Sequence, residues 1–372
     1  MIKLLLLIPT LDRSGAEKQL MLLATHLPRS EFKVHVVALT RAGPYANELA
    51  AAGIPVTVLG KRFKGDPVAW WRLRTLLKTW RPDVLHTWLF AANTYGRLAA
   101  GRRPSFPIVV SERCVDSWKS GWQIWLDRKL AGRMTRLVGN SQSVADFYRG
   151  QGLPPEKITV IQNGIEVPAV SECARADLRR ELGIPQESHV VGYIGRLARQ
   201  KRVLDLVWAF ELIRVMHGEV CFVIVGDGPE REKLEKFAHK LEVGQRIKFL
   251  GHRDDTPRLL SALDVFWLAS DFEGQSNSIM EAMAAGLPVV ASDISPNREL
   301  VIPGETGWLA GVGNRVEFAT LAERLLLDPA LARQFGEAGR NRIAASFSVE
   351  RMVEAYSRLY HEVCPGVLRC AE

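Results

Sequence analysis

The hydrophobic and polar positions of the chain follow two periods in alternation, and the alternation occurs twice. Short apolar runs typical of buried strands are separated by amphipathic stretches with helical spacing. The expected strands are 2–8, 33–39, 55–59, 83–87, 107–111, 136–139 and 157–161 in the first half, then 189–194, 220–225, 246–249, 263–267 and 288–291. Strands that alternate with helices favour parallel sheets with crossover helices. The sequence therefore predicts an α/β protein with two doubly wound domains.

The length of the chain agrees with two domains, because 372 residues exceed what one hydrophobic core usually supports. A turn-like segment at 162–166 places the boundary near Pro168, which gives domains at 1–168 and 169–346. Residues 347–372 form an expected C-terminal helix and tail. Apolar side chains recur there at near-helical spacing, namely Phe347, Met352, Tyr356, Leu359 and Tyr360.

The composition is that of an ordinary soluble protein, 47% hydrophobic and 24% charged. The run 2–8 is too short for a signal peptide, and no apolar stretch approaches the length of a membrane-spanning helix. The five cysteines lack C-x-x-C spacing, so we expect reduced thiols in a cytoplasmic protein. Residues 1–170 carry 24 Lys and Arg against 12 Asp and Glu, which indicates an anionic partner.

Two glutamates, Glu273 and Glu281, flank the start of an expected short helix. Such a helix start attracts phosphate, because its amides are unpaired and the macrodipole favours negative charge. Carboxylates beside an anion site would hold hydroxyls, and a sugar nucleotide offers both kinds of group. A structural alternative exists for Glu281, since Ser278-x-x-Glu281 has the form of a capping box. That alternative does not explain Glu273.

Two cations, Arg196 and Lys201, bracket a loop that begins at Gly195, directly after the strand 189–194. Cations there could clamp a diphosphate and neutralise its charge as it leaves. The alternative is two solvated loop side chains. The position favours function, because ligands of doubly wound sheets gather at the carboxyl ends of the strands.

Three weaker candidates also follow strands. Gly226 begins like a dinucleotide fingerprint, but the third glycine position is Arg231, so the segment is either a tight turn or the lining of a nucleotide cleft. Gly15 would let backbone amides approach a phosphate, or it forms a simple turn. His86 could orient a substrate or relay a proton, or it is a hydrogen-bonded core histidine.

Basic and aromatic residues mix in the first half at 61–64, 70–80 and 118–129. Helices at a membrane surface combine Lys and Arg with Trp and Leu in this way. Taken singly, the helix 70–80, which 61–64 precedes, and the helix 118–129 are each better explained as a crossover helix packed on the sheet. Together, in the basic half, they favour an anionic membrane surface over nucleic acid, for which no module signature occurs.

With these motifs the chain resembles the GT-B glycosyltransferase superfamily and is most similar to family 4, also called the group 1 glycosyltransferases. The strongest part of the resemblance is the E-x7-E element at Glu273 and Glu281. The segments that support it are Gly195-Arg196 with Lys201, then 14–17, 225–228, 140–141 and 162–165. The resemblance covers nearly the whole chain. It implies two facing Rossmann-like domains with the active site between them, and a last helix that crosses back to the first domain.

The resemblance also implies a role for each site residue. The C-terminal domain would hold a nucleoside diphosphate sugar and the N-terminal domain the acceptor. Glu281 would hold the ribose and Glu273 the donor sugar, while Arg196 and Lys201 would bind the diphosphate. The remaining contacts to the donor would come from the amides of Ser276, Asn277 and Ser278, from Gly15 in the other domain, and from Arg253 near the base.

The expected reaction is metal-independent hexosyl transfer to a hydroxyl of a glycan or lipid-linked acceptor in polysaccharide or glycolipid synthesis, with retention at the anomeric carbon. No D-x-D occurs, so a bridging divalent metal is not implied. We also expect no cofactor. His86 would orient the acceptor. We expect the protein at the cytoplasmic face of the inner membrane. A sugar-nucleotide epimerase, a pyridoxal-dependent phosphorylase and a non-catalytic membrane-surface protein stay open as alternatives.

Overall fold

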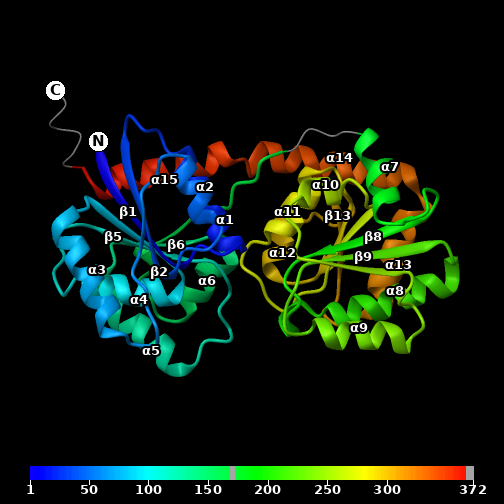
Figure 1. Ribbon diagram of the computed structural model, residues 1–372, viewed down its shortest axis with the longest axis horizontal. Coiled ribbons are helices and arrows are strands. Elements are labelled where there is room, and N and C mark those ends of the chain that lie inside the picture. The colour runs from blue at the N-terminus through cyan, green and yellow to red at the C-terminus, as the bar shows by residue number, and fades with distance from the viewer. Residues whose placement is uncertain (168–171, 366–372) are drawn as a thin grey trace. The chain divides into compact units, whose positions relative to one another are not determined.

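The computed structural model describes residues 1–167 and 172–365 (Figure 1). The chain divides into two compact units. The first unit is Met1–Gly164 together with the residues from Val349 onward, and the second is Ile165–Ser348. Each unit is a parallel sheet with helices between its strands, so the predicted α/β class is confirmed.

The sheet of the first unit has the order β3-β2-β1-β4-β5-β6-β7, and all neighbouring strands are parallel. Its strands are β1 (Ile2–Thr10), β2 (Phe32–Arg41), β3 (Val56–Val58), β4 (Val84–Trp88), β5 (Ile108–Glu112), β6 (Arg136–Gly139) and β7 (Ile158–Val160). Its helices are α1 (Gly15–His26), α2 (Tyr45–Ala51), α3 (Pro67–Trp80), α4 (Leu89–Ala99), α5 (Gly121–Leu130), α6 (Gln142–Gly150) and α15 (Val349–Val363), with short 3-10 turns at Ala131–Arg133 and Pro155–Lys157.

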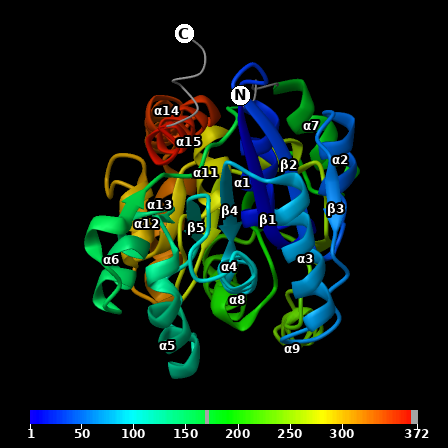
Figure 2. The same cartoon turned by 90° about the vertical axis from the view of Figure 1, so that its left-hand side faces the viewer.

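The alternation of side chains along β1 divides the core of this unit into two layers. Leu4 and Leu6 pack with the buried side chains of α1 and α15. Leu5 and Leu7 point to the opposite face and pack with α3 and α4, which lie together in Figure 2. Both faces of the sheet are covered, which explains why its strands are continuous apolar runs.

The helix α15 buries one apolar side against the first unit, through Met352, Tyr356, Leu359 and Tyr360. The prediction that the last helix crosses back to the first domain is therefore confirmed. The predicted start of that helical stretch was wrong. Phe347 follows the end of α14 (Pro329–Ser346), donates its N–H to the carbonyl of Ile343, and packs in the core of the second unit.

The sheet of the second unit has the order β10-β9-β8-β11-β12-β13 and is also parallel. Its strands are β8 (His189–Ile194), β9 (Val220–Val225), β10 (Ile247–Gly251), β11 (Val265–Leu268), β12 (Val289–Ser292) and β13 (Gly307–Ala310). Its other helices are α7 (Glu172–Glu181), α8 (Val203–His217), α9 (Arg231–Lys240), α10 (Thr256–Leu260), α11 (Asn277–Ala284), α12 (Ser295–Leu300) and α13 (Arg315–Leu327), and Arg199–Lys201 form the 3-10 turn η3.

The edge strand β13 was not predicted. It is four residues long, and its first residue, Gly307, weakens the apolar pattern. The structure explains that glycine, because a Cβ there would lie 2.3 Å from the carbonyl oxygen of Val289 on β12. The close approach of the two strands therefore requires the residue that obscures the strand in the sequence.

The helix α5 is attached to the first unit mainly through charges. Its buried residues are Asp127 and Leu130, whereas Trp122 and Trp125 are 56% and 57% exposed. The carboxylate of Asp127 accepts a hydrogen bond of 2.6 Å from the buried guanidinium of Arg97. A helix that buries an aspartate and exposes two tryptophans has its polarity reversed relative to an ordinary surface helix.

A fully buried ammonium group, that of Lys119, is surrounded by three carboxylates. Its Nζ lies 3.1 Å from Asp127, 3.1 Å from Asp116 and 3.2 Å from Glu112. Burial raises the pKa of Glu112 to about 7, although the positive charge of Lys119 opposes the rise.

Among the residues that the structure describes, no helix has the length and apolar character needed to cross a membrane.

The raised pKa of Glu112 predicts a loss of stability with rising pH. In the unfolded chain this carboxyl group ionises near its ordinary value of 4.5, but in the folded protein it stays protonated to about pH 7. Between these values the unfolded state binds fewer protons, so the free energy of unfolding falls as pH rises through the window. We expect Glu112→Gln, which cannot ionise, to lack this part of the fall.

Urea unfolding of both proteins across the window from about pH 5 to about pH 8 measures the difference. Glu156→Gln, at an exposed position of the same unit, is the matched control and should follow the wild type. Parallel curves for the wild type and Glu112→Gln would contradict the interpretation.

Candidate functional site

Most of the predicted site residues lie in the second unit, at the carboxyl ends of β8, β9 and β11. The strand β8 is central in the sheet, with β9 on one side and β11 on the other. The strand order therefore reverses between β8 and β11. Such a switch point is where doubly wound sheets form ligand crevices.

The structure brings Lys201 and Glu273 together. Lys201 ends η3 after β8, Glu273 lies between β11 and α11, and their Nζ and Oε1 atoms form an ion pair. Both are largely shielded, since 18% of the lysine side chain and 10% of the glutamate side chain are exposed. The hydroxyl of Ser270 donates a hydrogen bond of 2.6 Å to the same carboxylate oxygen. The carboxylate is therefore fixed in position by a cation and a hydroxyl.

Hydrogen bonds to backbone carbonyls hold the two loops that carry this pair. The N–H of Asp271 donates to the carbonyl of Gln200 at 2.9 Å, and the side-chain amide of Gln200 donates to the carbonyl of Phe272 at 2.6 Å. Arg202 adds an ion pair to Asp271 at 2.9 Å from a left-handed backbone conformation with φ of 49°. The two loops are thus joined independently of the charges of Lys201 and Glu273.

Arg196 is exposed on the loop that follows β8, five residues before Lys201. Its backbone is fixed, because the hydroxyl of Tyr193 donates to its carbonyl oxygen at 2.9 Å. Burial raises the pKa of Tyr193 well above its ordinary value, so this hydroxyl keeps its proton. Within the described part of the chain, the side chain of Arg196 forms no ion pair. An anion could therefore bind there without displacing a carboxylate.

The glycines after β8 and β9 let two loops pack directly on each other. Gly226 has a φ of +127°, and a Cβ there would lie 2.0 Å from the carbonyl oxygen of Gly195. A Cβ on Gly228 would lie 2.3 Å from the carbonyl oxygen of Leu197. This packing accounts for the Gly-x-Gly spacing without a dinucleotide fingerprint. A direct role of Gly195 or Gly226 in substrate binding stays a prediction.

The start of α11 rules out the capping-box interpretation of Glu281. The N-cap is Ser276, whose hydroxyl accepts a hydrogen bond of 3.4 Å from the N–H of Ile279, and the helix begins at Asn277. Ser278 therefore lies inside the helix, with its hydroxyl 3.2 Å from that of Ser276. Glu281 falls in the second turn, partly exposed, beyond the reach of a capping box.

Arg253 follows β10, which lies beyond β9 at the edge of the sheet. Its guanidinium makes two hydrogen bonds to Asp255, at 2.8 and 2.7 Å, and lies 3.5 Å from Glu181. These carboxylates raise the pKa of Arg253. The structure thus gives Arg253 a local partner, and its predicted position near a base is untested.

Gly15 lies in the first unit, where it is the first residue of α1. The hydroxyls of Ser14 and Thr10 both donate to the carboxylate of Glu17, which is buried. Burial raises the pKa of Glu17. This loop therefore has a fixed polar framework at the carboxyl end of β1, and a role of Gly15 in substrate binding stays a prediction.

His86 has the geometry of the alternative that the sequence left open, a hydrogen-bonded core histidine. It is fully buried, with Nδ1 2.7 Å from the hydroxyl of Tyr360 and Nε2 2.7 Å from the hydroxyl of Ser111. Burial, together with the positive charge of Arg113, lowers its pKa well below the ordinary value. The ring is therefore neutral near pH 7, and a role in acceptor orientation stays an untested prediction.

Sequence reasoning missed Ser270 and Gln200, which hold Glu273 and its loop. Ser270 lies just after β11, so the rule that singled out Arg196 after β8 would have included it. The contact of Gln200 with Phe272 has no local signal, because 72 residues separate the partners.

Among residues 1–167 and 172–365, no group of three or more His, Cys, Asp or Glu is arranged to hold a metal ion.

Comparisons with known proteins cover both units. Residues 174–342 match the model of "Glycosyl transferases group 1", and residues 13–168 match the model of "Glycosyltransferase Family 4". The glycogen synthase of Mycobacterium tuberculosis is 30% identical over 300 residues, which cover 76% of this chain and 69% of that protein. The N-acetyl-alpha-D-glucosaminyl L-malate synthase of Bacillus anthracis is 31% identical, but the match covers 56% of this chain and 55% of that protein.

A relative and a solved structure match over greater lengths. The UDP-Gal:alpha-D-GlcNAc-diphosphoundecaprenol alpha-1,3-galactosyltransferase of Escherichia coli is 28% identical, with 90% of each chain covered. The crystal structure of Anabaena HepE in complex with UDP-glucose has a TM-score of 0.87 and 25% identity, and covers 97% of this chain and 100% of that one. These matches agree with two Rossmann-like domains of the GT-B class.

The loop packing predicts that Gly226→Ala will destabilise the second unit. The substitution combines a clash with the backbone of Gly195 and a disfavoured φ, so we expect the free energy of unfolding to fall by on the order of 3 kcal/mol. Gly244→Ala is the matched control, because its nearest neighbour lies 4.0 Å away. Thermal and urea unfolding measure both variants, and equal stabilities would contradict the packing role.

Proposed function

Because the chain belongs to the group 1 glycosyltransferases, we propose that it transfers a sugar from a nucleoside diphosphate sugar to a hydroxyl of a glycan or lipid-linked acceptor. The observation that carries the proposal is the fixed arrangement of Lys201, Glu273 and Ser270, on loops that follow β8 and β11, with the exposed Arg196 on the same loop as Lys201. These groups match the two chemistries of such a donor. Cations suit its diphosphate, and a carboxylate suits its sugar hydroxyls.

We assign the donor contacts within the second unit as follows. Arg196 and Lys201 bind the diphosphate, together with the first amides of α11 at Ser276, Asn277 and Ser278. Glu273 accepts hydrogen bonds from hydroxyls of the donor sugar, and Glu281 from those of the ribose. The helix start at Asn277 places Glu281 in the second turn of α11, where its side chain is partly exposed, and this position supports the assignment to the ribose.

We further propose that the transfer retains the configuration of the anomeric carbon. The bond between that carbon and the diphosphate oxygen breaks, and the acceptor oxygen bonds to the carbon on the same face. The acceptor proton goes to the leaving phosphate oxygen. Negative charge grows on the diphosphate during this step, and Arg196 and Lys201 offset it. This arrangement supports a reaction that needs no added metal.

The acceptor is proposed to be bound by the first unit, at a membrane surface. The first unit carries the basic excess of the chain and exposes several tryptophans, among them Trp71, Trp118 and Trp125, at 62%, 54% and 57%. Lys and Arg with exposed tryptophans suit an anionic interface. The Escherichia coli relative, named for a diphosphoundecaprenol acceptor, supports a lipid-linked acceptor.

Removal of either half of the ion pair should abolish most of the transfer. We expect Lys201→Ala and Glu273→Gln each to lower kcat by about 100- to 1,000-fold, because each removes a charge aimed at the reacting part of the donor. Lys236→Ala is the matched control, since Lys236 pairs with Glu232 on the surface of α9 and is 75% exposed. Turnover is measured with a panel of labelled nucleotide sugars and lipid extract as acceptor.

The same assay tests the finer proposals. Wild-type turnover in both folded variants would contradict the assignment of the pair. Nuclear magnetic resonance of the product gives its anomeric configuration, and inversion would overturn the proposed mechanism. Loss of activity in a chelator, restored by a divalent cation, would overturn metal independence. Release of an altered nucleotide sugar without an acceptor would indicate an epimerase instead.

Membrane binding should depend on charge and on the exposed tryptophans. We expect co-sedimentation with anionic vesicles to weaken as salt rises from about 0.1 M to 1 M, since the screening length falls from about 10 Å to about 3 Å. The double substitution of Trp71 and Trp118 by Ala should weaken it further. Met216→Ala, at a position of the second unit that is 52% exposed, is the control. Binding that ignores both salt and lipid charge would reject the proposal.

A further inference from the structure

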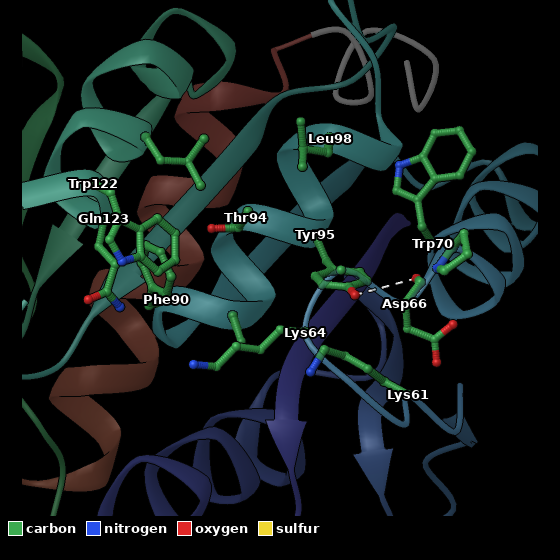
Figure 3. A pocket seen from close by; sticks show the side chains of 14 residues that line it. Lys61, Lys64, Asp66, Trp70, Phe90, Thr94, Tyr95, Leu98, Trp122 and Gln123 are labelled. Atoms are coloured by element: carbon green, nitrogen blue, oxygen red, sulfur yellow. Dashed lines mark hydrogen bonds between the residues drawn. The ribbon is translucent and has the colours of Figure 1, made fainter. Parts of the chain in front are cut away.

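A pocket of about 720 Å³ lies in the first unit between α3, α4 and α5 (Figure 3). This volume is in the range of small-molecule sites, which is about 300 to 1,000 Å³. None of the residues assigned to the donor lines it. Its lining is mainly aromatic and aliphatic, with Trp70, Phe90, Tyr95, Leu98, Trp122 and Leu126.

The floor of the pocket is one face of α4. Phe90, Thr94 and Leu98 recur at intervals of four residues and therefore share a side of the helix. From Phe90 to Leu98 the helix rises about 12 Å, at about 1.5 Å per residue. Trp70 of α3 and Trp122 of α5 lie on opposite sides of this face in Figure 3. The pocket is thus an elongated groove with aromatic walls.

The attachment of α5 through charges explains why the groove is open. Asp127, buried against Arg97 and Lys119, anchors the polar side of the helix in the unit. The tryptophans of α5 are consequently left outside the core, and Trp122 is 56% exposed although it lines the groove. A hydrocarbon that buried this exposed apolar surface would bind favourably.

Two lysines, Lys61 and Lys64, lie at the end of the groove opposite Leu98 in the view of Figure 3. Lys61 places its Nζ 5.6 Å from the centre of the Tyr95 ring, and neither lysine forms an ion pair within the described part of the chain. The nearby carboxylate of Asp66 accepts from the backbone amides of Arg62, Val68 and Ala69 and caps α3. The two ammonium groups therefore remain available to an anion.

We infer that this groove binds the hydrocarbon chain of a single-chain lipid phosphate, with the phosphate against Lys61 and Lys64. An apolar groove that ends in two cations is complementary to a molecule with one long apolar part and one anionic head. The inference rests on the proposed function for one point, that this lipid carries the acceptor sugar. It names the class of that acceptor, and it gives the chain a site distinct from the membrane surface itself.

The affinity for such a ligand should depend on the length of its chain. We expect hexyl, octyl and decyl phosphate, used below their micelle-forming concentrations, to bind progressively more tightly. Each buried methylene should contribute a factor of about four until the groove is filled. Isothermal titration of the full chain without vesicles measures the series. The alcohols of the same lengths should bind more weakly, because they cannot use the lysines.

Two tryptophans on α5 provide a matched pair. Trp122 and Trp125 have nearly the same exposure, but only Trp122 lines the groove. We expect Trp122→Ala to flatten the dependence on chain length and Trp125→Ala to preserve it. Ala91→Trp, which fills the groove, should abolish chain binding. If both alanine variants lose affinity equally, or if the wild type shows no dependence on length, the inference is overturned.

The head group is tested separately. The double substitution of Lys61 and Lys64 by Gln should lower the affinity for decyl phosphate about tenfold or more while leaving that for decanol unchanged. Lys78→Gln, an exposed change on α3 away from the groove, should leave both unchanged. Displacement of decyl phosphate by an equal concentration of soluble, two-chain dioctanoyl phosphatidylglycerol would overturn the assignment to a single-chain lipid.

Failure of this inference is distinguishable from failure of the proposed function. Titration with alkyl phosphates requires no donor and no turnover. A protein that transfers sugar to an acceptor but shows no preference for longer chains would refute the groove alone. A protein that binds decyl phosphate in the groove but transfers no sugar would refute the transferase proposal and leave the groove as a lipid-phosphate site.

Discussion

The contact between Lys201 and Glu273 is the constraint on which the candidate site depends. Two ionised groups with little exposure are stable only as partners, because removal of one leaves a charge that neither water nor protein fully compensates. Ser270 adds a hydrogen bond that fixes the carboxylate. The pair also joins the loop after β8 to the loop after β11, the two strands between which the chain reverses its order in the sheet.

The pair explains how a site can stay preorganised without its substrate. In the free protein the ammonium group and the carboxylate satisfy each other. Under the proposed function, a donor offers each of them a replacement, a phosphate for Lys201 and a hydroxyl for Glu273. The loops need not rearrange, since Gln200 and Asp271 hold them by separate contacts. Binding then exchanges partners on a fixed frame, which lowers the reorganisation required for the reaction.

The sequence predicted the features that follow from local patterning. Apolar runs located twelve strands within a few residues, and the rule that ligands meet at carboxyl strand ends selected Arg196 and Lys201. Prediction from the sequence failed where a contact between distant residues determined the local structure. Gly307 is required by the carbonyl of Val289, so the apolar run of β13 is only three residues long. The hydrogen bond between His86 and Tyr360 spans 274 positions, which no local pattern can reveal.

The lysines of this protein differ in the number of their carboxylate partners and in their exposure. This difference indicates whether each lysine can bind an external anion. Lys119 is fully buried among three carboxylates, so an external anion could neither reach it nor improve on its partners. Lys201 has one carboxylate partner and a little exposure, and under the proposed function it exchanges that partner for a phosphate. Lys64 is exposed at the end of an apolar groove and has no carboxylate partner in the described part of the chain. Lys119 therefore positions α5, whereas Lys201 and Lys64 are suited to bind ligands.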